Sequence, residues 1–143
     1  MGGSVYTGLC GVALMYLRLY AAGVAGALPL SDTTAYIDRP CVCVEASGGA
    51  FHRQDYASMH TGSAGYYAVA AGVAMQRGEG EAASQIVSQS LLPIGTTVEE
   101  RLERGECDVL YGRSGYLQAL LYVRHALGEP SIGTDSVRRI IKQ

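Results

Sequence analysis

The stretch Leu110-Tyr111-Gly112-Arg113-Ser114-Gly115-Tyr116 holds a Gly-x-x-Gly motif that leads directly into an apolar segment of helical length. The same motif precedes similar apolar segments twice earlier in the chain, as Gly8-Leu9-Cys10-Gly11 and Gly62-Ser63-Ala64-Gly65. The first glycines of successive motifs are separated by 62 − 8 = 54 and 112 − 62 = 50 residues. A near-constant period of this size is typical of repeat proteins, in which one helical unit buries its apolar face on the next. We therefore predict an all-α repeat fold.

The six motif glycines are interpreted as structural residues. Glycine permits a tight turn and lets the following helix approach its neighbours closely, because it carries no Cβ atom. The positions concerned are Gly8, Gly11, Gly62, Gly65, Gly112 and Gly115.

The composition suits one domain with a real core. The chain has 143 residues, 48% of them hydrophobic and 17% charged, with a net charge of −2. It lacks a Lys/Arg cluster that could neutralise phosphates, so we predict no nucleic-acid partner. The four cysteines form no Cys-x-x-Cys motif, and the N-terminus lacks the basic region of a signal peptide. These features predict a cytoplasmic protein with reduced thiols, and leave association with a membrane surface open.

Apolar segments after the motifs predict three inner helices. The first covers residues 12–22 and has apolar residues on all sides, so we expect it to be buried nearly all round. Continued to Leu30, it is long enough to consider a membrane span. Arg18 in its middle, the glycines and Pro29 argue against a span and favour a buried helix. The second and third inner helices are predicted at residues 66–75, ended by Gly78, and 116–127.

Amphipathic segments predict the outer helices. In residues 79–92, ended by Pro93, one side carries Ala82, Ala83, Ile86, Val87, Ser90 and Leu91, and the other carries Glu81, Ser84, Gln85, Ser88 and Gln89. Another outer helix begins at residue 131, with Val137, Ile140 and Ile141 as its apolar edge. Residues 98–104 suit a short charged helix. A helix at 34–46 is interrupted by Pro40, and residues 41–44 also suit a short strand.

Two segments resemble the N-terminal repeats of eukaryotic LanC-like proteins, relatives of the bacterial lanthionine synthetase cyclases. They are Gly3-Ser4-Val5-Tyr6-Thr7-Gly8 with Gly11-Val12-Ala13-Leu14, and Glu106-Cys107-Asp108-Val109-Leu110-Tyr111-Gly112-Arg113-Ser114-Gly115-Tyr116-Leu117. The resemblance covers essentially this whole chain but only the first part of a typical family member. It implies an (α/α) toroid of helical hairpins whose Gly-x-x-Gly turns open the inner helices. Residues 1–143 would form a partial toroid of about three repeats, the third incomplete.

The resemblance also implies zinc-dependent thiol chemistry. In the family, zinc activates the thiol of a peptide cysteine or of glutathione, which adds to a dehydrated Ser or Thr to form a thioether. The ligands precede the first motif glycine of later repeats, in Cys-x-Gly-x-x-Gly and Cys-His-Gly-x-x-Gly. Here those positions read Tyr6-Thr7, His60-Thr61 and Leu110-Tyr111, so only His60 can coordinate a metal. We expect no cofactor and no catalysis from this chain alone, with the zinc ligands lying beyond Gln143.

Three residues are candidates for binding glutathione or a dehydrated peptide, if the motif turns converge on one rim. They are His60, Tyr111 and Arg113. Arg113 can hold a carboxylate, aided by the positive end of its helix, or form a structural ion pair with Asp108 or Glu106. His60 can equally be a cap or packing residue. A zinc site from Cys10, His60 and Cys107 is less favoured, because the two cysteines differ in their offsets from the motif.

Two other classes of function remain open at this level. Rings of helical hairpins also serve as glycosidases, which need paired carboxylates, and Asp55, Glu106 and Asp108 lie near the motif turns without forming an evident acid and base. The other is a non-catalytic interaction module. An open arc of three repeats would leave apolar helix faces uncovered, which predicts an oligomer, a partner or further repeats.

Overall fold

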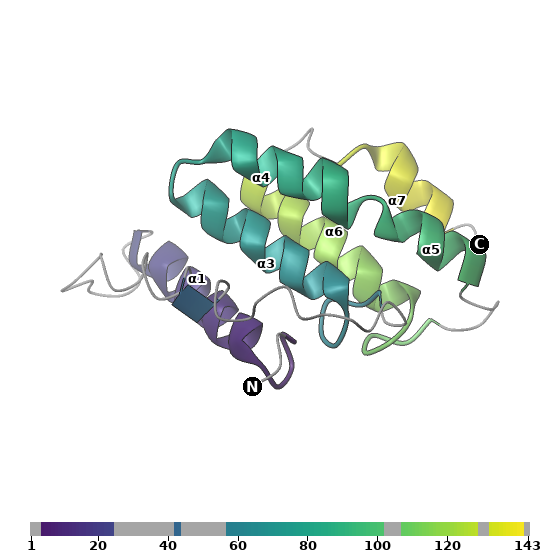
Figure 1. Ribbon diagram of the computed structural model, residues 1–143, viewed down its shortest axis with the longest axis horizontal. Helices are drawn as coiled ribbons and strands as arrows, with labels where there is room; N and C mark the ends of the chain where they lie inside the picture. The colour runs from purple at the N-terminus through teal and green to yellow at the C-terminus, as the bar shows by residue number, and fades with distance from the viewer. Residues whose placement is uncertain (1–3, 25–41, 44–56, 102–106, 129–131, 142–143) are drawn as a thin grey trace.

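The computed structural model describes residues 4–24, 42–43, 57–101, 107–128 and 132–141. Its helices are α1 (Leu9–Val24), α3 (Ser63–Gln76), α4 (Gly80–Ile86), η1 (Val87–Leu91), α5 (Ile94–Arg101), α6 (Arg113–Leu127) and α7 (Thr134–Ile141). Figure 1 shows their arrangement. No strand occurs in the described ranges, and the prediction of an all-α protein is confirmed.

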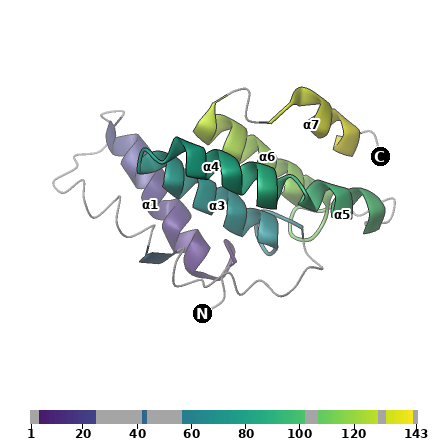
Figure 2. The ribbon, with the colours of Figure 1, turned by 45° about the horizontal axis from the view of Figure 1, so that its top comes forward.

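The helices that follow the motifs lie side by side. Helix α3 packs against α1 on one side and α6 on the other, while α4 and η1 pack on α3 and α7 packs on α6 (Figures 1 and 2). Each inner helix of the second and third repeats is therefore covered by the outer helix that follows it in the chain. The core between these layers includes the fully buried residues Val69, Leu91, Tyr116, Leu120 and Val123.

The outer helix of the second repeat agrees with its predicted pattern. Every residue of the predicted apolar side is buried or half-buried, and every residue of the predicted polar side is exposed. The segment begins as α4 and closes as the π-helix η1, with the amide of Leu92 donating to the carbonyl of Val87 at 2.9 Å. Pro93 follows the helix, and Gly78, at φ +80°, ends α3 as predicted.

Helix α1 differs from its prediction. Cys10, Ala13 and Leu17 are buried, but Val12 and Met15 are 40% and 49% exposed. The expectation of burial nearly all round was wrong, because α1 lies at the edge of the described row of helices and packs mainly on α3. An apolar residue is buried only where a neighbouring element covers it.

Smaller differences concern element boundaries. Val42 and Cys43 are helical, which overturns the strand interpretation for those two positions, and the rest of residues 34–46 lies outside the described residues. Helix α5 begins at Ile94 rather than at residue 98, and α6 begins at Arg113 rather than at Tyr116. In α7, Ile140 is buried but Ile141 is 65% exposed. Within the described ranges, no helix has the length and hydrophobicity needed to cross a membrane.

Candidate functional site

The three motif turns share one hydrogen-bond pattern. In each, the residue four positions before the first motif glycine caps the turn with its side chain. Each capping oxygen accepts a hydrogen bond from the backbone amide of the residue three positions later. The pairs and their N–O distances are Ser4–Thr7 (3.1 Å), Ser58–Thr61 (3.1 Å) and Asp108–Tyr111 (2.8 Å). These capping residues were not singled out from the sequence. Ser, Ser and Asp nevertheless recur four positions before the first motif glycine, and these residue types favour turn caps.

The second glycine of each motif is pressed against backbone. A Cβ atom placed on it would overlap the carbonyl oxygen of the residue six positions earlier, in the pairs Gly11–Val5, Gly65–Met59 and Gly115–Val109. The same contact at the same offset in all three repeats explains why glycine recurs there. Any side chain would push the turn away from the start of its helix.

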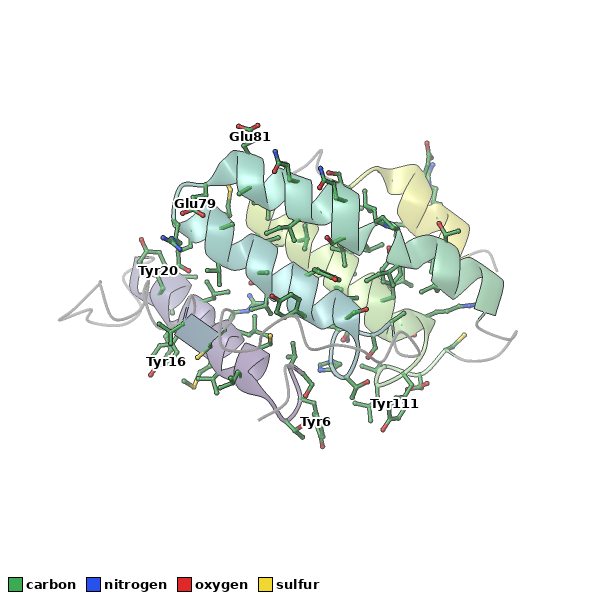
Figure 3. The ribbon with its side chains drawn as sticks, viewed as in Figure 1. Tyr6, Tyr16, Tyr20, Glu79, Glu81 and Tyr111 are labelled. Atoms are coloured by element: carbon green, nitrogen blue, oxygen red, sulfur yellow. The ribbon has the colours of Figure 1, made fainter. Side chains whose placement is uncertain are left out.

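The turns are joined to one another in a row. The amide of Tyr6 donates to the carbonyl of His60 at 2.9 Å, and the amide of Met59 donates to the carbonyl of Gly115 at 2.9 Å. The hydroxyls of Ser58 and Thr61 both donate to the carbonyl of Leu110. We call this edge, formed by residues 4–11, 58–65 and 108–115, the turn rim. Figure 3 shows Tyr6 and Tyr111 at the same side of the molecule.

The three candidate residues have different surroundings on the turn rim. His60 is half-buried, and its Nε2 lies 2.8 Å from Oε1 of Gln118 on α6. Tyr111 is 47% exposed, whereas Arg113, the first residue of α6, is 6% exposed. The carboxylate of Asp108 accepts hydrogen bonds from the backbone amides of Leu110 and Tyr111, so it stabilises the third motif turn. Asp55 and Glu106 lie outside the described residues.

A groove runs along α3 between α1 and α6. It consists of two adjoining hollows, of about 390 Å³ nearer the turn rim and about 460 Å³ nearer the C-terminal end of α3. Both hollows are lined by Arg18, Tyr122 and His125. The first is also lined by Val5, Leu14, Met59, His60, Gln118 and Leu121, and the second by Leu17, Tyr20, Ala21, Gly72, Met75, Gln76 and Ala126. We call this feature the α3 groove; its size falls in the range typical of ligand sites.

The α3 groove is basic. Arg18, His60 and His125 line it, and none of its described lining residues is Asp or Glu. The guanidinium carbon of Arg18 lies 5.5 Å from the centre of the Tyr122 ring, a cation–π arrangement. Burial raises the pKa of Tyr122 above its ordinary value of 10.0, while Arg18 acts in the opposite direction. Tyr122 therefore stays protonated at neutral pH.

Gly72 gives Tyr122 its place in the groove. A Cβ atom on Gly72 would lie 2.6 Å from the Tyr122 hydroxyl oxygen, so the tyrosine can lie against α3 only because that position has no side chain. Gln118, Tyr122 and His125 are spaced at i, i+4 and i+7 along α6 and so share one face of it.

Sequence reasoning singled out His60 among the polar lining residues but missed Arg18, Gln118, Tyr122 and His125 as a site. Arg18 was noticed only as a charge that argues against a membrane span. Arg18 is exposed, and a single charge in an otherwise apolar helix indicates only which side of that helix other elements leave uncovered. The partners on α6 could not be inferred, since they lie about a hundred residues further along the chain.

A metal site does not form from the described residues. No three His, Cys, Asp or Glu side chains gather among them, so Cys10, His60 and Cys107 do not make the zinc site considered above. Cys10 is buried, Cys107 is exposed, and His60 is bonded to Gln118. Zinc prefers four tetrahedral ligands of Cys, His or carboxylate type, and this donor set does not fit it.

The family of the chain follows from a comparison with known proteins. A family model described as lanthionine synthetase C-like protein matches residues 1–143, the whole chain. The match spans all three linked turns, the helices they open and both sides of the α3 groove. The chain belongs to the lanthionine synthetase C-like protein family.

Proposed function

We propose that residues 1–143 form the N-terminal repeats of a LanC-like helical ring and supply a substrate-binding part of its inner wall. The observation that carries this proposal is the α3 groove, a basic groove that begins at His60 on the turn rim. Family membership over the whole chain and the row of three joined inner helices support it. The exposed apolar residues Val12 and Met15 on α1 also suit an edge that a further repeat would cover.

The reaction proposed for the complete ring is addition of a thiol to a dehydrated Ser or Thr. The sulfur forms a bond to the β-carbon of the alkene, and a proton is added to the α-carbon. Zinc held by ligands in other repeats would supply stabilisation of the thiolate, since the donor set of the described residues does not fit the metal. The contribution of this chain is to bind and orient substrate, in a cytoplasm that keeps thiols reduced.

Glutathione is the thiol that we propose for the hollow nearer the turn rim. It carries two carboxylates and an amine, and this hollow offers Arg18, His60, His125 and the amide of Gln118. Binding is tested by titrating S-methylglutathione into isotope-labelled protein and following the amide resonances. We expect saturable shifts near His60 and Gln118, weakened in His60→Ala. The matched control is Arg138→Gln, which changes an exposed residue of α7 away from the groove.

Elemental analysis tests the zinc part of the proposal. We expect residues 1–143 to hold no stoichiometric zinc after purification with added zinc. One tightly bound zinc per chain would overturn this part, and would require a ligand set other than the one described.

A glycosidase is not favoured by the site. Such enzymes place two carboxyl groups across a cleft, about 5 to 9.5 Å apart. The described lining residues of the α3 groove include no carboxylate, and the carboxylate of Asp108 is engaged by backbone amides.

A further inference from the structure

We infer that the α3 groove binds an extended peptide that carries an anionic side chain, recognised by Arg18 together with His125. The inference rests on the proposed function in one respect, that the grooved face is turned toward substrate. It goes beyond that function by naming the substrate feature that this part of the wall selects.

The two hollows together are long enough for an extended peptide. Its lining residues accompany the whole of α3, from His60 and Met59 before the helix to Met75 and Gln76 at its end. A helix of 14 residues is about 21 Å long at 1.5 Å per residue. That length accommodates about six residues of an extended chain at about 3.3 Å per residue. Glutathione would occupy only the hollow nearer the turn rim, whereas an extended peptide would occupy both hollows.

The charge of the groove selects an anion. The protein has a net charge of −2 with histidine counted as neutral, yet the groove is lined by the cation Arg18 and by two histidines, and its described lining includes no acidic residue. Arg18 belongs to neither of the ion pairs Arg77–Glu79 and Arg138–Asp135, and its guanidinium lies over the Tyr122 ring. A guanidinium can hold a carboxylate or a phosphate through two parallel hydrogen bonds.

The position of Arg18 favours recognition at the middle of the ligand. Arg18, Tyr122 and His125 are the residues that both hollows share, so an anion bound there has groove on either side of it. The Tyr122 ring lies 5.5 Å from the guanidinium carbon and limits the freedom of the arginine before binding. Leu14, Met59, Met75 and Leu121 line the groove on either side and suit apolar neighbours in the peptide.

The experiment compares three fluorescein-labelled heptapeptides that differ only at the central residue, which is glutamate, phosphoserine or glutamine. Apolar residues flank that position, and binding is followed by fluorescence anisotropy. We expect the better anionic peptide to bind about tenfold tighter than the glutamine peptide, because hydrogen bonds to charged groups are stronger than neutral ones. Tighter binding of the glutamate peptide identifies a carboxylate ligand, and tighter binding of the phosphoserine peptide identifies a phosphate.

Variants assign the discrimination to the groove. Arg18→Gln should remove the preference for the anionic peptide, Arg18→Lys should keep part of it, and His125→Gln should reduce it. Arg138→Gln, on exposed α7, should leave it unchanged. Circular dichroism and thermal unfolding show whether each variant is folded. If Arg18→Gln unfolds, a reduced anion preference in the folded Arg18→Lys and His125→Gln variants supports the assignment, and an unchanged preference in both overturns it.

Two results would overturn the inference. One is equal binding of the three peptides to the unaltered protein, and the other is an anion preference that persists in folded Arg18→Gln. The S-methylglutathione titration is a separate readout. Glutathione binding without peptide discrimination would defeat this inference alone, whereas failure of both ligands would also defeat the proposed function.

Discussion

The backbone amide of Met59 donates a 2.9 Å hydrogen bond to the carbonyl of Gly115, and so joins the second motif turn to the first turn of α6. The carbonyl of Met59 lies directly against Gly65 at the start of α3. One residue thereby sets the positions of two neighbouring inner helices. Because the first turn is tied to the second through Tyr6 and His60, α1, α3 and α6 are held in one row, and the α3 groove forms along that row.

The close contact at the second motif glycine predicts a strong effect of a single methyl group. Gly65→Ala should lower the free energy of unfolding by about 2 kcal/mol, since overpacking against backbone outweighs the gain in helix propensity of about 1 kcal/mol. Gly80→Ala is the matched control, because Gly80 also lies in a helix but has only Met75 Sδ near its Cβ position, at 4.0 Å. It should be neutral or stabilising. Urea unfolding measures both, and equal stability of the two variants would contradict the packing role.

The capping serines of the first two turns should differ in their importance. Ser58 is fully buried and its hydroxyl also donates to Leu110 of the next turn, whereas Ser4 is half-buried and bonds within its own turn. Ser58→Ala should cost about 1–2 kcal/mol of unfolding free energy, and Ser4→Ala about 0.5 kcal/mol. Thermal and urea unfolding of the two variants check the order. A larger effect of Ser4→Ala would show that the link between turns contributes little.

Two half-buried tyrosines, Tyr66 and Tyr122, predict a loss of stability at alkaline pH. Burial raises the pKa of Tyr122 and of Tyr66 above 10.0, and for Tyr66 the neighbouring Cys10 and Tyr67 act in the same direction. Above pH 10 the unfolded chain loses tyrosine protons that the folded chain retains, so the free energy of unfolding falls as pH rises. Below that pH the contribution is fully present.

Phenylalanine variants test this dependence. Tyr122→Phe and Tyr66→Phe should each make the decline above pH 10 less steep, because a group that titrates differently in the two states has been removed. Tyr6→Phe, at a position 67% exposed, is the control and should follow the unaltered protein. Urea unfolding at a series of pH values gives the slope of the unfolding free energy against pH for each variant. Equal slopes for Tyr122→Phe, Tyr66→Phe and Tyr6→Phe would contradict the role of the two half-buried tyrosines.

The exposed edge of α1 predicts self-association of residues 1–143. Val12 and Met15 are 40% and 49% exposed on a helix that packs mainly on α3. The double variant Val12→Thr with Met15→Gln should shift the chain toward the monomer in analytical ultracentrifugation, because it makes that face polar. Val109→Thr, on the turn rim, is the control for an exposed apolar residue elsewhere. A stable monomer of the unaltered chain would contradict the partial-ring proposal.

Local patterns in the sequence were enough to determine the helical repeat. The spacing of apolar and polar residues in 79–92 placed each side chain on the correct side of α4 and η1, and Gly78 and Pro93 bounded the helices around it. These features are readable because helix periodicity, capping and proline geometry depend on residues close together in the chain. The recurring Gly-x-x-Gly located the turns for the same reason.

Tertiary structure decided which surfaces those helices bury and which they leave open. The sequence of α1 has apolar residues on all sides of the helix and does not show which side is buried. In the structure, neighbouring elements cover Ala13 but leave Met15 exposed. The α3 groove depends on Arg18, His60 and His125 coming from three distant segments. Hydrogen bonds between the turns and packing between the helices bring these residues together. Contacts between residues so far apart in the chain produce no local sequence pattern from which they could be predicted.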